Sequence, residues 1–151
     1  MNDFYTDLLY SLEETEDKMF DAFYHKYFPF TIDKIEFQTN REMQKRGVDK
    51  ILYLANGNII TIDEKKRRVA YGDILLETWS VYEKEVKGWL FKAKCDYIAY
   101  AVMPSKRIYM LPIVQLRRAW ITNKNKWSKY PIKKAQNNGY TTHNIDRKSV
   151  V

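Results

Sequence analysis

The chain has 151 residues, of which 45% are apolar and 15% aromatic, and a formal net charge of +7. This length supports one domain around one core, and the apolar content excludes a disordered chain. The single cysteine, Cys95, excludes a disulfide framework or a cysteine-built zinc site, and it is typical of a reducing compartment. The acidic start and the absence of a long apolar run predict a cytoplasmic protein without a signal peptide or a membrane partner.

The charge is unevenly distributed along the chain. Residues 1–22 carry seven acids against one lysine, a net charge of −6, whereas residues 121–151 carry seven Lys and Arg against one Asp, a net charge of +6. Cations interleaved with Trp and Tyr are typical of surfaces that bind nucleic acid, although lysine-rich faces can also serve solubility alone. The cations expected to contact nucleic acid are Lys45, Arg46, Lys66, Arg67, Arg68, Lys124, Lys126, Lys133 and Lys134.

Apolar residues three or four apart predict one long amphipathic helix that begins at Phe4 and ends before Pro29. The Asn56-Gly57 pair, between two apolar runs, predicts a β-hairpin. Strands are expected over residues 35–37, 48–54, 59–65 and 73–79.

The second half of the chain predicts shorter elements. Residues 83–91 are charged and predict a helix or long turn with a break at Gly88, and Pro112 begins a short helix that reaches Trp120. Residues 97–103 and 107–111 predict a second hairpin, residues 122–139 a basic exposed loop, and residues 141–150 a final edge strand. The order of elements indicates a single α/β (α+β) domain over residues 1–151, with a mixed sheet and flanking helices.

Three residues form the best candidate for chemistry. Asp49 opens one predicted strand, and Asp63 and Lys65 lie two apart on the next. Because side chains two apart on a strand share a face, Asp63 and Lys65 should point the same way. The overlapping pattern Glu64-Lys65-Lys66 is a competing frame, and the register of the hairpin decides between the two.

The length of the hairpin loop sets that register. A two-residue turn at Asn56-Gly57 would place Asp49 opposite Glu64. A three-residue loop, with Gly57 in the left-handed region, would instead place Asp49 opposite Asp63. We expect the second arrangement, because it brings both aspartates and the lysine onto one face.

An acid that opens one strand, followed on the next strand by acid-x-Lys, resembles the pattern of the PD-(D/E)XK nuclease superfamily. The resemblance covers residues 44–77, and the helix–strand–strand–strand order around them is also similar. The family's proline is absent, since Val48 precedes Asp49. The resemblance implies a restriction-endonuclease-like fold with a mixed central sheet, in a small member similar to Holliday-junction resolvases.

Hydrolysis of a phosphodiester needs a nucleophilic water and neutralisation of the charge that develops on phosphate oxygens. Asp49, Asp63 and the backbone carbonyl of Glu64 offer the hard oxygen ligands that Mg²⁺ or Mn²⁺ prefers, and such an ion acidifies a bound water. By resemblance, Lys65 would orient that water or stabilise the transition state. Its ammonium, near two carboxylates, should stay protonated, which favours the electrostatic role.

Three further residues are weaker candidates. By resemblance, Glu16, on the apolar stripe of the first helix, matches a glutamate that some members place beside the metal; alternatively it is a partly exposed residue at the edge of that stripe. Glu77 lies in an apolar strand and needs a partner, such as Lys65 or an arginine. Gln44 occupies a position where related nucleases often carry a polar residue near the substrate or metal.

These expectations describe a Mg²⁺-dependent endonuclease that cleaves DNA to 5′-phosphate and 3′-hydroxyl ends. Without a second specificity domain it should be structure-selective or nonspecific, as in junction resolution or nicking during phage DNA recombination in the host cytoplasm. A homodimer could span a duplex. The alternative is a non-catalytic nucleic-acid-binding module that retains the fold, and a third class is a partner-binding inhibitor that uses the acidic first helix.

Overall fold

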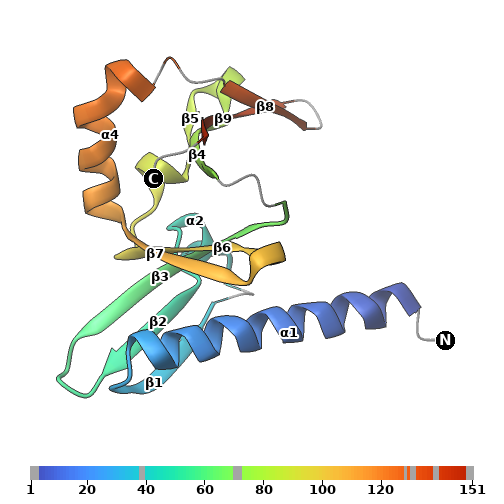
Figure 1. Ribbon diagram of the computed structural model, residues 1–151, viewed down its shortest axis with the longest axis vertical. Helices are drawn as coiled ribbons and strands as arrows, with labels where there is room; N and C mark the ends of the chain where they lie inside the picture. Colours follow the sequence, from blue (N-terminus) through green and yellow to red (C-terminus); the bar gives the residue numbers. More distant parts are fainter. Residues whose placement is uncertain are drawn as a thin grey trace.

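The computed structural model describes residues 4–37, 40–69, 73–127, 129, 132–137 and 140–148, with side chains described for residues 14–37, 40–69, 74–127 and 129. Two sheets and four α-helices make up the described fold (Figure 1). This arrangement confirms an α+β fold with a mixed sheet and flanking helices.

The larger sheet has five strands in the order β1-β2-β3-β6-β7. The first three form an antiparallel meander, β3 and β6 run parallel, and β6 and β7 form an antiparallel hairpin. The strands are β1 (Thr31–Glu36), β2 (Lys50–Leu54), β3 (Ile59–Arg67), β6 (Tyr97–Val102) and β7 (Arg107–Pro112).

Helices cover both faces of this sheet (Figure 1). The long helix α1 (Phe4–Tyr27) lies on one face, where Phe20 and Tyr24 pack in one core cluster with β2, β3 and β6. The other face carries α2 (Arg41–Lys45), α3 (Trp89–Lys92) and α4 (Ile113–Trp127). The core on that second face consists of Val48, Ala93, Cys95, Ile98, Tyr100 and Ile113.

The smaller sheet is antiparallel throughout, in the order β5-β4-β9-β8. Its strands are β4 (Asp73–Val81), β5 (Val86–Lys87), β8 (Ile132–Asn137) and β9 (Tyr140–Lys148). Leu76 of β4 packs with Leu90, Trp120 and Trp127, so α3 and α4 join this sheet to the rest of the molecule. Two 3₁₀ turns, η1 (Tyr82–Lys84) and η2 (Met103–Ser105), connect strands.

Where the structure describes it, the basic segment at residues 122–139 is helix and strand rather than the loop that composition predicts. The helix α4 continues to Trp127, which lies seven residues, or two turns, after Trp120 and is buried with it at a ring separation of 6.1 Å. Residues 132–137 then form β8, which pairs with β9. The strand β9 is consequently interior rather than an edge strand, because β4 and β8 flank it.

Two smaller differences lie near the candidate site. The strand β1 begins at Thr31 rather than at residue 35. The five-residue helix α2 is too short for a periodic pattern, but Asn40 caps it by accepting a hydrogen bond from the Met43 N–H.

Among the helices that the structure describes, none combines the length and apolarity that crossing a bilayer would require.

The structure confirms the three-residue hairpin loop. Lys50 pairs with Ile62 and Tyr53 with Ile59, and Asp49, just before β2, donates its N–H to the Ile62 carbonyl at 2.8 Å rather than pairing with Asp63. The Leu54 N–H donates to the Asn58 carbonyl at 2.9 Å, which closes the loop. Gly57 has a φ of +84°, in the left-handed region that favours glycine.

We predict that Gly57→Ala lowers the free energy of unfolding by about 1 kcal/mol, since a Cβ is disfavoured at positive φ. No atom lies within 4 Å of the Cβ position, so backbone strain alone is tested. Urea unfolding provides the measurement, with Gly57→Asn as a control that should lose less, because Asn tolerates this region. An alanine variant as stable as the wild type would contradict the requirement for glycine.

Candidate active site

The structure brings Asp49, Asp63 and Lys65 together on the face of the large sheet opposite α1. The Lys65 Nζ lies 3.1 Å from Asp63 Oδ1 and 2.9 Å from Oδ2. Asp49, immediately before β2, accepts a hydrogen bond on Oδ2 from the Glu64 N–H at 2.7 Å. Asp63 is only 3% exposed, whereas Lys65 is 32% exposed and Asp49 is half-buried, so the cluster reaches solvent through the lysine and Asp49.

Asp63 is held in an environment that opposes its negative charge. Burial is the largest cause and raises its pKa to about 7. The charge of Lys65 lowers this pKa, but the adjacent carboxylate of Asp49 raises it again. Asp63 has the one partly exposed Lys65 as its ion-pair partner and a second carboxylate beside it, so the site has less positive than negative charge, which a bound cation would offset.

The donor set fits a hard divalent cation. Asp63 Oδ2 is buried and accepts no hydrogen bond, although it contacts the Lys65 ammonium as an ion pair. The N–H and C=O of one strand residue point to the same edge of the strand, so the Glu64 carbonyl lies on the edge of β3 from which its N–H donates to Asp49. The described residues contain no cluster of three or more His, Cys, Asp or Glu able to hold a metal. Two carboxylates and one carbonyl would thus leave several ligand positions to water.

The backbone before Asp49 packs closely on the site. Gly47, with a φ of +68°, lies so near that a Cβ there would be 3.5 Å from Asp63 Oδ2 and 3.0 Å from the Ala93 Cα. The Val48 N–H donates to the Met43 carbonyl, which joins α2 to this turn. The geometry of Asp49 therefore depends on contact between the segments around Gly47 and Ala93.

We call Asp49 and Asp63 the acid pair. Cys95 is buried close to Asp63. Burial, followed by the charge of Asp63, raises the pKa of its thiol to about 12. The thiol therefore stays protonated and packs as a small apolar group.

Glu77 supports the site from the second sheet. Its Oε1 accepts a hydrogen bond from the Trp89 N–H at 3.2 Å, at the start of α3. Burial raises its pKa, while the Trp89 N–H and the charges of Lys65 and Lys92 lower it. The expected influence of Lys65 on Glu77 is present, and the direct hydrogen-bond partner is the backbone of α3.

Glu16 does not join the acid pair. Its carboxylate is buried on the α1 side and binds Lys66 at 3.0 Å and Arg68 through both guanidinium nitrogens. Burial raises the pKa of Glu16, but the bonds to Arg68 and Lys66 outweigh it and hold the pKa below its usual value. An ion-paired glutamate on this face is not a ligand for a cation between Asp49 and Asp63.

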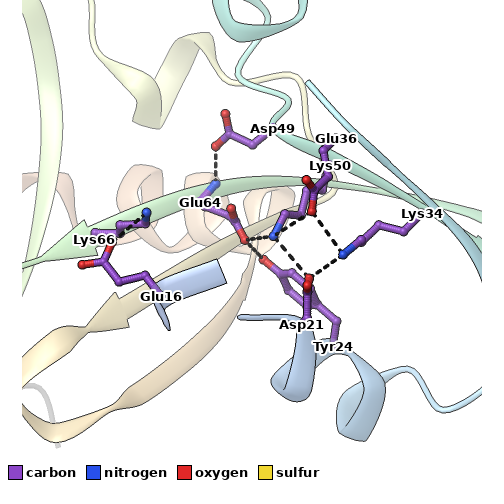
Figure 2. A network of polar contacts seen from close by, with 9 residues as sticks. All are labelled: Glu16, Asp21, Tyr24, Lys34, Glu36, Asp49, Lys50, Glu64 and Lys66. Carbon is purple, nitrogen blue, oxygen red and sulfur yellow. Dashed lines mark hydrogen bonds and ion pairs between the residues drawn. The ribbon is translucent and has the colours of Figure 1, made fainter. Parts of the chain in front are cut away.

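The side chain of Glu64 also faces α1 (Figure 2). The competing pattern, Glu64-Lys65-Lys66, therefore does not bring its glutamate to the same face as Asp49. Its Oε2 accepts a hydrogen bond from the Tyr24 hydroxyl at 2.6 Å and lies 3.0 Å from the Lys50 Nζ. Burial raises the pKa of Glu64 despite the opposing effects of Lys50 and Tyr24. Glu64 can therefore serve the candidate site through its backbone only.

Lys50 is the centre of this second polar network and is fully buried. Besides Glu64, its ammonium lies 3.6 Å from Asp21 and 3.8 Å from Glu36, and 5.5 Å and 5.2 Å from the ring centroids of Phe20 and Tyr24. Lys34 binds the same two acids, at 2.6 Å and 3.1 Å (Figure 2). The sequence reasoning missed Lys50, although its position two residues before Leu52 placed it on the buried side of the strand.

The expected nucleic-acid contacts differ in availability. Lys45 and Arg46 are exposed, as are Lys124 and Lys126 at the end of α4. Arg67 is buried, and Lys66 and Arg68 bind Glu16. Gln44 is exposed on α2, where its backbone carbonyl accepts a hydrogen bond from the Gly47 N–H. The side chains of Lys133 and Lys134, on β8, lie outside the described residues.

Comparison with family models, with curated proteins and with solved structures found no match for this chain. The fold and the geometry of the site are therefore what bear on its function.

We predict that the metal-free wild type loses stability as pH rises from about 4 to about 7. The folded state then has to release the Asp63 proton, which the unfolded chain loses near its ordinary pKa of 3.8. Below pH 4 both states hold this proton. Asp63→Asn should remove the decline and gain up to roughly 4 kcal/mol at pH 8.

Urea unfolding in EDTA, followed from pH 4 to 8, measures this effect. The exposed Asp33→Asn is the matched control and should keep the wild-type profile. Parallel pH profiles for Asp63→Asn and the wild type would show that the buried carboxyl is not protonated in the fold.

We predict that Lys50→Met lowers the free energy of unfolding by about 3 kcal/mol, because it leaves Glu64 buried without its cation. The double variant Lys50→Met/Glu64→Gln should recover most of this loss, since both charges are then removed and Tyr24 can still donate to the amide. Urea unfolding of the wild type, these two variants and Glu64→Gln gives the four free energies of unfolding that a double-mutant cycle needs. Additive losses would contradict a coupled pair.

Proposed function

We propose that this protein is a metal-dependent endonuclease that hydrolyses phosphodiester bonds of DNA, with a site of the PD-(D/E)XK type. The observation that carries the proposal is the convergence of Asp49 and Asp63 on one face of the sheet, with the Lys65 ammonium 2.9 Å from Asp63. The strand order that produces it, an antiparallel meander followed by a parallel strand, is a mixed central sheet as the resemblance implies.

Each group has a role in such a reaction. Asp49, Asp63 and the Glu64 carbonyl would hold Mg²⁺ or Mn²⁺, which supplies an acidified water and neutralises phosphate charge. Lys65, partly exposed and bound to Asp63, can donate to a phosphate oxygen or to the attacking water. Glu77 acts through α3, and we assign it a positioning role only.

The biological setting is part of the proposal. The resemblance to small junction-resolving enzymes favours a structure-selective or nonspecific enzyme, which acts as a homodimer on branched or nicked DNA during phage recombination in the host cytoplasm. The exposed cations near the site and on α4 are compatible with a polyanionic substrate.

One observation favours the alternative, a binding module that retains the fold without activity. Among the described residues the site has no third carboxylate, and burial keeps Asp63 partly protonated near neutral pH. A module of this kind would bind DNA but would not cut it in the presence of either ion.

Cleavage of supercoiled, branched and single-stranded DNA, each with Mg²⁺ or Mn²⁺, tests the proposal. We predict that Asp63→Asn and Lys65→Met each lower the cleavage rate at least about 100-fold, because each removes a group that contacts the ion or the reacting phosphate. Lys66→Met is the matched control: it removes the neighbouring lysine, on the opposite face, and should retain the wild-type rate.

Three outcomes separate the possibilities. Loss in both site variants with cleavage by Lys66→Met supports the nuclease. Bound but uncut DNA in every condition supports the binding module. Cleavage that persists in both site variants shows that the reacting groups lie elsewhere.

A further inference from the structure

Four exposed cations border the acid pair where two distant segments of the chain meet. Lys45 and Arg46 end α2, and Lys92 and Lys94 flank Ala93 at the end of α3. The Lys94 N–H donates to the Arg46 carbonyl at 2.9 Å, which ties the two segments together. We call Lys45, Arg46, Lys92 and Lys94 the basic rim.

The basic rim adjoins the candidate site directly. Gly47, next to Arg46, packs against Ala93 on one side and against the Asp63 carboxylate on the other. A phosphate bound by the rim would therefore be close to Asp63 and Lys65.

The backbone that carries Lys92 and Lys94 is fixed from both ends. Glu77 accepts from the Trp89 N–H at the start of α3. At its end, Arg117 of α4 donates from Nε to the Leu90 carbonyl at 2.8 Å and from a second nitrogen to the Ala93 carbonyl. The backbone that carries these two lysines is thus preorganised, which lowers the entropic cost of binding a ligand.

The charges of the rim are available to a partner. Within the described side chains, no ion pair engages any of its four cations, in contrast to Lys66 and Arg68, which Glu16 holds. Among nearby acids, Asp96 already accepts from the N–H and the hydroxyl of Thr61, and Glu77, whose charge interacts with that of Lys92, accepts from the Trp89 N–H. The first turn of α2 contributes one further acid, Glu42.

We propose that the basic rim binds the sugar-phosphate backbone of a nucleic acid and delivers one phosphodiester to the acid pair. The choice of a nucleic acid over an acidic polypeptide rests on the proposed function and on Phe91, the residue before Lys92, whose ring packs edge-to-face with Trp120 and is 38% exposed, so that a base can stack on its open part. The rim, rather than the basic end of the chain, is then the principal phosphate-binding surface.

Equilibrium binding in EDTA tests the rim without requiring cleavage. The probes are fluorescein-labelled DNAs: a 20-nucleotide single strand, a 20-base-pair duplex and a four-way junction, titrated from 50 to 200 mM salt. We predict that Lys92→Gln/Lys94→Gln weakens binding roughly fivefold to tenfold and lowers the salt slope by about 1 for each cation removed. Lys45→Gln/Arg46→Gln should act similarly.

The matched control is Lys106→Gln/Arg107→Gln, which removes the same charge from the exposed turn between β6 and β7. Asp63 pairs with Ile98, and this turn follows Val102, four residues or about 13 Å further along β6. The control should leave the salt slope unchanged, and Lys92→Arg/Lys94→Arg should retain binding.

Several results would contradict the proposal that the basic rim binds nucleic acid. These are an unchanged salt slope in both rim variants, a larger loss from Lys124→Gln/Lys126→Gln, equal competition by polyglutamate, or no DNA binding by the wild type. Failure of the nuclease proposal looks different: the rim variants lose binding as predicted, yet the wild type cleaves no DNA with Mg²⁺ or Mn²⁺.

Discussion

The alternation of side chains along β3 is the constraint on which both polar clusters of this protein depend. Successive residues of a strand point to opposite faces, so Asp63 and Lys65 meet Asp49 on one side while Glu64 meets Lys50 on the other. The three-residue loop, with Gly57 in the left-handed region, sets the pairing that aligns the two strands. A shift by one residue would exchange the two sets and place Asp63 among the rings of α1.

The two faces of the large sheet treat buried charge in opposite ways. On the α1 face, Glu16 and Glu64 each meet cations, so removal from water is offset by pairing and by hydrogen bonds. On the other face, Asp63 pairs with Lys65 and Asp49 accepts from the Glu64 N–H, and burial raises the pKa of Asp63 to about 7. Buried carboxyls that resist losing their protons lower the free energy of unfolding at neutral pH, and such groups are typical of functional sites.

The short helix α3 connects parts of the molecule that are distant in sequence. Glu77 holds its start from the small sheet, Arg117 holds its end from α4, and Lys94, two residues past its end, donates its N–H to the Arg46 carbonyl. The small sheet is thus linked through α3 to Ala93, which packs against Gly47 beside Asp63. The same contacts align the basic rim with Asp63, so the fold couples the candidate site to the surface beside it.

The sequence alone determined the features that depend on local periodicity: the long helix α1, the hairpin around Gly57, and the shared face of Asp63 and Lys65. Only the tertiary structure decided that Glu16 binds Lys66 and Arg68, that Glu64 turns toward Tyr24, and that residues 132–137 form a strand. Tyr24 and Glu64 are 40 residues apart, and a periodic pattern states which face a residue occupies but not which segment covers that face. For the same reason the burial of Lys50 could be read from its strand position, whereas its partners on α1 and β1 could not.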